Sequence, residues 1–371
     1  MPLRDVFCQD KAIAFLQRAF GSGKVPHAYI FAGMEGVGKF KTARQWAKLL
    51  LCENPCRETG FADSCGSCQS CRLFEADSHP DFHHVYKELV EFTKEGKGKK
   101  TPVLLPIDVI REFLIQKVAT RPTLSQRKVF VVSEAEKLNA ASQNALLKVL
   151  EEPPAYCCIV LLCTRLERLL PTTKSRCQIV RFGPVDEEKI SARLKEVGLE
   201  QRHAQYFARL SQGSMGTDCQ WAALQSDGAE LYQSKKKLVA AVANCELQNA
   251  LELAHQFLDS AKSIAAVWSN LDADTSKADI NRRAQKTLIQ VAISALHDAM
   301  MLNTITNRRL INFDQESEIR KLANRLSPEE EAEKIADCYK SLRWIEAAVN
   351  EKLLFEQLLL SFAKSDIMTI E

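Results

Sequence analysis

The sequence lacks the features that would mark a membrane protein, a secreted protein or a dedicated DNA-binding protein. It has no run of about 18 apolar residues, so no segment is expected to span a membrane. Charges near its start fall where a secretion signal needs an apolar core, which favours a cytoplasmic protein. Its 50 Lys and Arg residues nearly balance 47 Asp and Glu residues, for a formal net charge of +3. Any contact with DNA is therefore expected to be local.

The last part of the chain lacks glycine and almost lacks proline. From Glu230 to Glu371 there is no Gly, and Pro328 is the only proline. A stretch of this length without helix breakers predicts an all-helical bundle. The segment before it is also helical in pattern and is interrupted at Gly198 and Gly213–Gly216. We therefore predict a small helical domain at residues 184–228 and a helical C-terminal domain at residues 229–371.

The first half of the sequence alternates short apolar runs with helical patterns. Two of the runs are continuously apolar, as expected of strands that are buried on both faces of a parallel sheet. Alternating strands and helices predict an α/β domain with a mostly parallel sheet, which we place at residues 1–183. The predicted strands are Tyr29–Ala32, Phe82–Tyr86, Val129–Val132, Cys158–Cys163 and Gln178–Phe182.

A glycine-rich loop follows the first predicted strand and precedes a helix. Its glycines Gly33, Gly36 and Gly38, followed by Lys39, match the spacing of a P-loop. Glycines let backbone N–H groups turn towards a phosphate, the helix N-terminus adds a positive dipole end, and the lysine reaches the outer phosphates. The sequence therefore predicts a nucleotide-binding P-loop fold.

Two residues depart from the pattern of an active ATPase, and both departures affect magnesium. Phe40 stands where an active P-loop has a Ser or Thr that binds Mg²⁺, and Thr42 lies too far around the helix to replace it. Ser133, ahead of Glu134, stands where P-loop ATPases usually have a magnesium-binding Asp. We expect a degenerate site that binds ATP weakly, if at all, and does not turn it over.

The thirteen cysteines suggest a metal site and not a disulfide framework. Two thiolates from each Cys-x2-Cys turn can reach one ion, and four thiolates form a closed tetrahedral zinc site. An iron–sulfur cluster and a chance clustering are the alternatives. Cys52, at the apolar end of the preceding helix, is expected to belong to the core. The predicted ligands of a structural Zn²⁺, in a module at residues 56–71, are Cys56, Cys65, Cys68 and Cys71.

Four further motifs allow a comparison with a known family. They are His27-Ala28-Tyr29, His79-Pro80-Asp81, the segment Asn144–Pro154 (NALLKVLEEPP) and the segment Thr173–Gln178 (TKSRCQ). Together with the P-loop and the cysteine module, they make the chain resemble the bacterial clamp-loader branch of the AAA+ ATPases. The resemblance is firm over residues 5–183 and covers the remainder by general architecture alone.

The resemblance implies a subunit of a DNA polymerase III holoenzyme. In that family a ring-like pentamer with a helical collar uses ATP to open a sliding clamp and place it on primed DNA. Its gamma/tau subunits are the motors, and they would carry an arginine in the segment that here is Gly213–Thr217. Because that arginine is missing and Phe40 and Ser133 are altered, the resemblance implies a stator subunit without ATPase activity of its own. An active gamma/tau-type ATPase is the alternative.

The resemblance also assigns roles to domains, residues and partners. It makes residues 184–228 a lid domain and residues 229–371 the collar domain through which subunits oligomerise. Thr164 corresponds to the family's sensor residue. Arg176 corresponds to the arginine that reaches the γ-phosphate bound by a neighbouring subunit, although it can instead pair locally at a strand end. The implied partners are the gamma/tau and delta subunits, the sliding clamp and primed DNA.

One more reading starts from local charge. The stretch from Lys94 to Lys128 holds nine Lys and Arg against three Asp and Glu. The segment Thr93–Thr101, which overlaps its start, is expected to be a flexible basic loop. Either a solvated surface or a DNA contact fits this stretch. A stand-alone zinc-stabilised nucleic-acid-binding protein would be expected to carry more positive charge overall.

Overall fold

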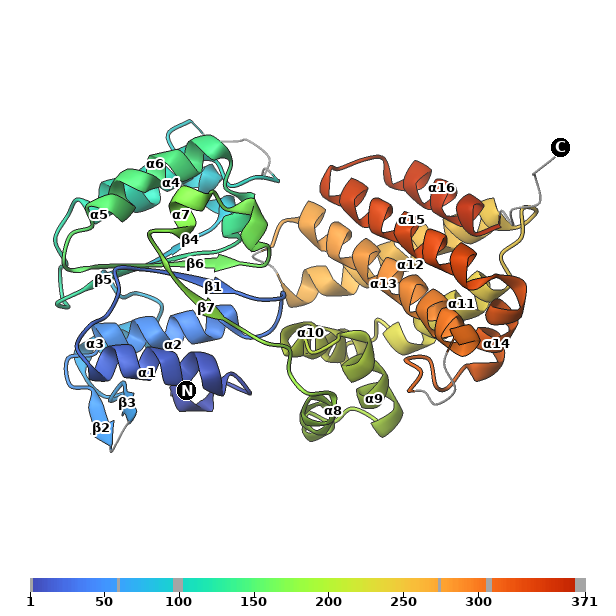
Figure 1. Cartoon of the computed structure of the whole chain (residues 1–371), viewed down its shortest axis with the longest axis horizontal. Coiled ribbons are helices and arrows are strands. Elements are labelled where there is room, and N and C mark those ends of the chain that lie inside the picture. Colours follow the sequence, from blue (N-terminus) through green and yellow to red (C-terminus); the bar gives the residue numbers. More distant parts are fainter. Residues whose placement is uncertain (1–2, 59–60, 96–102, 273–274, 305–308, 364–371) are drawn as a thin grey trace. The chain divides into compact units, whose positions relative to one another are not determined.

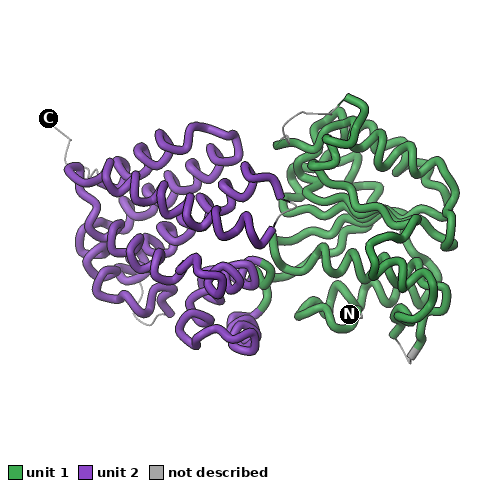
Figure 2. The backbone as a smooth tube through the Cα atoms, turned by 180° about the vertical axis from the view of Figure 1, so that it is seen from behind, with its two compact units in different colours: residues 1–185, 214–216 green, residues 186–213, 217–371 purple. Residues whose placement is uncertain are grey.

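The computed structural model describes residues 3–58, 61–95, 103–272, 275–304 and 309–363. It divides into two compact units, one of Met1–Val185 with Ser214–Gly216 and one of Asp186–Gly213 with Thr217–Glu371 (Figure 2). The predicted lid and helical bundle thus lie together in the second unit, and a domain boundary near residue 229 stays a prediction. Most of the predicted basic loop at residues 93–101 lies outside the described residues.

The first unit is built on a five-stranded parallel sheet, which confirms the predicted α/β class. The strands lie in the order β4, β5, β6, β1, β7, and each neighbouring pair is parallel. Their bounds are β1 Ala28–Ala32, β4 Phe82–Val85, β5 Lys128–Val132, β6 Cys157–Cys163 and β7 Gln178–Arg181.

Two hydrophobic cores, one on each face of the sheet, explain the continuous apolar runs. Phe31 and Val160 face one core together with Trp46 of α2. Their neighbours in the strands, Ile30 and Ile159, face the other core. Because successive side chains of a strand point to opposite faces, both alternating sets must be apolar when both faces are covered.

Helices cover both faces of this sheet (Figure 1). On one side lie α1 (Asp10–Gly21), α2 (Lys39–Leu51) and α3 (Gln69–Glu75). On the other side lie α6 (Ala140–Glu151) and one continuous helix made of α4 (Ile107–Ile110), a π-helical turn (Arg111–Ile115) and α5 (Gln116–Val118). The remaining elements are the antiparallel pair β2 (Cys56–Glu58) and β3 (Phe61–Asp63), α7 (Pro171–Lys174), and short 3₁₀ helices at Leu3–Asp5, Lys87–Phe92, Ala135–Lys137 and Leu166–Arg168.

The described part of the second unit is helical. Arg209 connects the first helices of this unit to the later ones. Its guanidinium pairs with Glu187 at 2.9 Å and donates to the carbonyl of Leu310. Among the described residues, no helix is both long enough and apolar enough to cross a membrane. The helices are α8 Glu187–Glu196, α9 Gln201–Leu210, α10 Met215–Ser226, α11 Leu231–Ala243, α12 Ala250–Leu271, α13 Lys277–Thr304, α14 Glu316–Arg325, α15 Pro328–Glu346 and α16 Glu351–Ala363.

Candidate functional site

The predicted phosphate loop connects β1 to α2. Gly36 and Gly38 have φ angles of 75° and 98°, in the left-handed region that favours glycine. Gly33 is required for a different reason, because a Cβ atom there would lie 2.5 Å from the carbonyl oxygen of Phe182. Lys39 is buried, and its Nζ donates to the carbonyl of Gly33 at 2.6 Å. The sequence therefore places its three glycines and its lysine in one compact turn.

The segment that lacks the motor arginine packs directly on this loop. Ser214 Oγ donates to the carbonyl of Glu35 at 2.8 Å, and the backbone N–H of Gly216 donates to the carbonyl of Gly36 at 2.7 Å. A Cβ atom on Gly216 would lie 2.8 Å from the Cα of Gly36. Glycine at position 216 is therefore what allows the two backbones to approach so closely.

His84 contacts two of the predicted nucleotide-site residues, Ser133 and Phe40. Its Nε2 lies 2.8 Å from Ser133 Oγ, and its ring centroid lies 4.7 Å from that of Phe40. Burial, with a smaller contribution from Arg44, lowers the pKa of His84 to about 4, so the imidazole is neutral at pH 7. Thr42 Oγ1 donates to the carbonyl of Gly38 at 2.9 Å.

The acidic residue after β5 is engaged by lysines. Glu134 adopts a left-handed backbone conformation with φ of 52°, and its carboxylate pairs with Lys137 and lies 3.8 Å from Lys87 Nζ. Thr164, at the end of β6, donates its hydroxyl to Glu136. The predicted nucleotide-site residues thus all lie in the first unit. Those that have a side chain beyond hydrogen each contact another residue of the same chain.

Arg176 lies between α7 and β7, at the edge of the first unit. Its Nη1 donates to the carbonyl of Thr172 at 2.9 Å, and its Nη2 pairs with Glu151 at 2.7 Å. One third of its side-chain surface remains exposed. Arg176 is therefore paired within its own chain and is also partly exposed to solvent.

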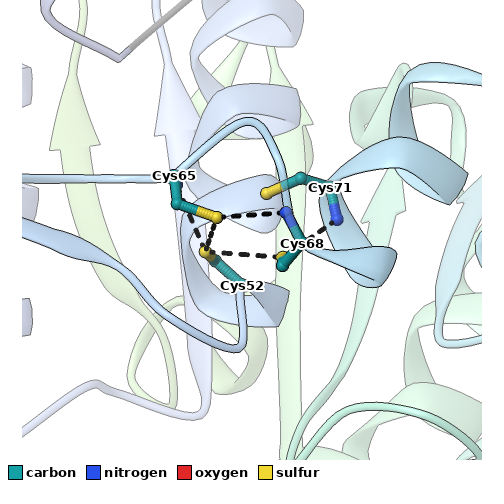
Figure 3. A group of neighbouring side chains, drawn as sticks. All are labelled: Cys52, Cys65, Cys68 and Cys71. Atoms are coloured by element: carbon teal, nitrogen blue, oxygen red, sulfur yellow. Dashed lines mark hydrogen bonds between the residues drawn. The ribbon is translucent and has the colours of Figure 1, made fainter.

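Four cysteine thiols come together beside α3 (Figure 3). The sulfur atoms of Cys52, Cys65, Cys68 and Cys71 all lie within 4.8 Å of one another. Cys52 Sγ lies 3.6 Å from Cys65 Sγ and 4.0 Å from Cys68 Sγ. Four thiolates around a tetrahedral zinc ion at about 2.3 Å would lie roughly 3.8 Å apart. The group therefore fits a metal ion of this kind.

The fourth thiol of this group is Cys52, so the predicted ligand Cys56 is wrong as a member of the cluster. Helix α2 ends at Leu51, and Cys52 at its C-cap has an extended ψ of 130°, so the chain is no longer helical after it. Cys56 begins β2 and is exposed. The sequence places Cys52 in the core because Leu49–Leu51 before it are apolar, but Cys52 is only half-buried, and its Sγ accepts the backbone N–H of Cys65 at 3.3 Å.

Backbone N–H groups also donate hydrogen bonds to the sulfurs of this group, which favours the thiolate form that binds a cation. The amides of Cys65, Cys68 and Cys71 donate to the sulfurs of Cys52, Cys65 and Cys68 at 3.3–3.4 Å. Burial opposes ionisation of Cys65, but N–H donors outweigh it and lower its pKa to about 6. Burial raises the pKa of Cys52 to about 11. Cation binding would supply the charge that lets all four ionise.

A buried polar network ties the cysteine module to the sheet. Ser70 of α3 donates to the carbonyl of Leu51, and its hydroxyl lies 2.9 Å from His79 Nε2. Asp81 is fully buried and accepts N–H bonds of 2.6–2.8 Å from residues 123–125. The His79-Pro80-Asp81 motif was the only sequence signal for this network. No sequence pattern identified His84 or the close contact between Gly216 and Gly36.

Comparison with known families agrees with this architecture. A model described as "DNA polymerase III, delta subunit" matches residues 8–186, and one described as "DNA polymerase III, delta subunit, C terminal" matches residues 278–364. The chain is similar to the DNA polymerase III subunit delta' of Escherichia coli, with 34% identity over 62% of each chain. It is 37% identical to that of Pseudomonas aeruginosa over 42% of this chain and 43% of the relative.

Motor-type subunits are also among the relatives. The DNA polymerase III subunit tau of E. coli is 33% identical over 57% of this chain and 31% of the relative. The alignments thus span less than two thirds of the length of these relatives. On the two matches to its family models and its similarity to several delta' subunits, the chain belongs to the bacterial clamp-loader family of DNA polymerase III delta and delta' subunits.

Proposed function

We propose that this chain is the delta'-type stator subunit of a bacterial DNA polymerase III clamp loader. In that role it helps to load the sliding clamp onto primed DNA, and it acts in the cytoplasm as part of a complex with gamma/tau and delta subunits. The family match supports the complex, and the delta' relatives support the type of subunit.

The proposed stator role rests on the residues that occupy the chain's own nucleotide site. Phe40, His84 and Ser133 fill the place where an ATPase holds magnesium, and none of them offers the carboxylate that Mg²⁺ prefers. Glu134, which would orient the attacking water, is held by Lys137. ATP hydrolysis in the complex is therefore assigned to neighbouring subunits.

This chain's contribution to hydrolysis is a trans-acting arginine. Arg176 stands at an exposed edge of the first unit, as an arginine must if it is to reach a phosphate on a neighbouring subunit. A guanidinium beside a γ-phosphate stabilises the negative charge of phosphoryl transfer, and such arginines accelerate it by about 10³–10⁵.

The cysteine group takes a structural role in this proposal. We assign it a single Zn²⁺ held by Cys52, Cys65, Cys68 and Cys71. Four thiolates complete the tetrahedron and leave no position for a substrate, so the ion would stabilise the module without catalysing a reaction.

The alternative is an active motor of the gamma/tau type. Mixing this chain with purified gamma/tau and delta subunits and measuring assembly by size-exclusion chromatography tests the stator proposal. We expect this chain to enter the complex without being able to replace gamma/tau. A complex in which this chain alone supplies the ATPase would favour the motor.

A further inference from the structure

The C-terminal end of α6 lies beside Arg176. Glu151, the last residue of α6, places its Oε1 2.7 Å from Arg176 Nη2. A carboxylate at a helix C-terminus meets the negative end of the helix dipole, which disfavours it locally. The cationic guanidinium of Arg176 beside Glu151 offsets that cost. The ion pair with Arg176, and not the helix, therefore explains why an acidic residue stands at this position.

The same helix holds the segment before Arg176 at a second point. Gln143 is almost fully buried, and its Nε2 donates to the carbonyl of Arg168 at 3.2 Å. Its Oε1 accepts from the backbone N–H of Leu170 at 2.8 Å. Helix α6 therefore fixes the chain on both sides of α7, with Gln143 before it and Glu151 after it.

The described contacts of Arg176 leave it able to bind a phosphate. A guanidinium has five N–H donors, and the acceptors recorded beside it are Thr172 O, Ser175 Oγ and Glu151 Oε1. One third of the side chain is exposed, and the ion pair with Glu151 restricts the rotation of a long and otherwise flexible side chain.

We propose that Glu151 is a positioning residue for Arg176, and that it holds the guanidinium in the orientation needed to reach a phosphate on a neighbouring subunit. The inference rests on the proposed trans role of Arg176. A carboxylate that instead sequestered the arginine would lower the rate of hydrolysis, so the two possibilities predict changes of opposite sign when Glu151 is removed.

The test uses the reconstituted clamp-loader complex and its DNA-stimulated ATPase. Glu151→Ala is expected to reduce the Arg176-dependent part of kcat about three- to fivefold, the range of an exposed ion pair, with KM for ATP unchanged. Glu151→Gln is expected to retain more activity, because an amide oxygen still accepts from the guanidinium. Glu152→Ala removes the same charge one residue further on and is expected to leave the rate unchanged.

A double-mutant cycle separates positioning from general damage. In the Arg176→Ala background, Glu151→Ala is expected to have no further effect, since there is no guanidinium left to position. The proposal is overturned if Glu151→Ala matches or exceeds the wild-type rate, if it lowers the rate equally without Arg176, or if Glu152→Ala lowers it as much. If Arg176→Ala itself has no effect, the proposed trans role fails first.

Discussion

His84 Nε2 lies 2.8 Å from Ser133 Oγ, so a neutral imidazole contacts the residue that follows β5. The ring centroid of the same imidazole lies 4.7 Å from that of Phe40 in α2. Both substitutions that alter the nucleotide site are thus packed into one cluster, and changing either residue alone leaves the rest of the cluster in place.

The isolated chain is expected to have no ATPase activity above that of its Lys39→Ala variant. Calorimetry is expected to find weak nucleotide binding, with no gain in affinity when Mg²⁺ replaces a chelator. The double variant Phe40→Thr, Ser133→Asp is expected to stay inactive, because His84 and the arginine-free segment at residues 213–217 remain. Steady ATPase activity that is lost on Lys39→Ala would contradict the stator assignment.

The protein is expected to contain about one zinc ion per chain, measured by elemental analysis after purification without chelators. Cys52→Ser and Cys68→Ser are each expected to lose the metal and to lower the unfolding temperature of the first unit, because three thiolates leave the site open. Cys56→Ser is the matched control and is expected to keep both the metal and the wild-type unfolding temperature. Zinc that depends on Cys56 and not on Cys52 would overturn the proposed ligand set.

Asp81 is expected to make the stability of the first unit depend on acid pH. Burial alone would raise its pKa, but three backbone N–H donors outweigh burial and lower it. Its contribution is therefore full above the unfolded pKa of about 4 and is lost as the pH falls through the lower folded pKa. At pH 7, Asp81→Asn is expected to cost about 1–3 kcal/mol.

Hydrogen exchange locates that effect. In the Asp81→Asn variant, the amides of residues 123–125 are expected to exchange faster, and the stability difference from wild type is expected to shrink as the pH falls towards 3. Asp77→Asn, at an exposed carboxylate that pairs with Arg44, is the control. Unchanged protection at residues 123–125 would show that Asp81 does not hold this segment.

The fold was predictable from local patterns, and the packing between distant segments was not. Continuous apolar runs identified β5 and β6 because both faces of the sheet are buried. Cys52 was missed because the residues before it, Leu49–Leu51, are apolar, while its neighbours in space are thiols. The pairing of His84 with Ser133 joins residues 49 positions apart, and no local pattern records such a contact.

Arg176 in the assembled complex gives the most direct test of the account. The Arg176→Ala variant is expected to fold and assemble normally, because a partly exposed arginine contributes little to the stability of its own chain. DNA-stimulated ATPase at the adjacent site and clamp loading are expected to fall sharply, and Arg176→Lys is expected to restore them poorly, since lysine lacks the planar fork of donors. Wild-type ATPase and clamp loading by an intact complex that carries Arg176→Ala would contradict the proposed mechanism.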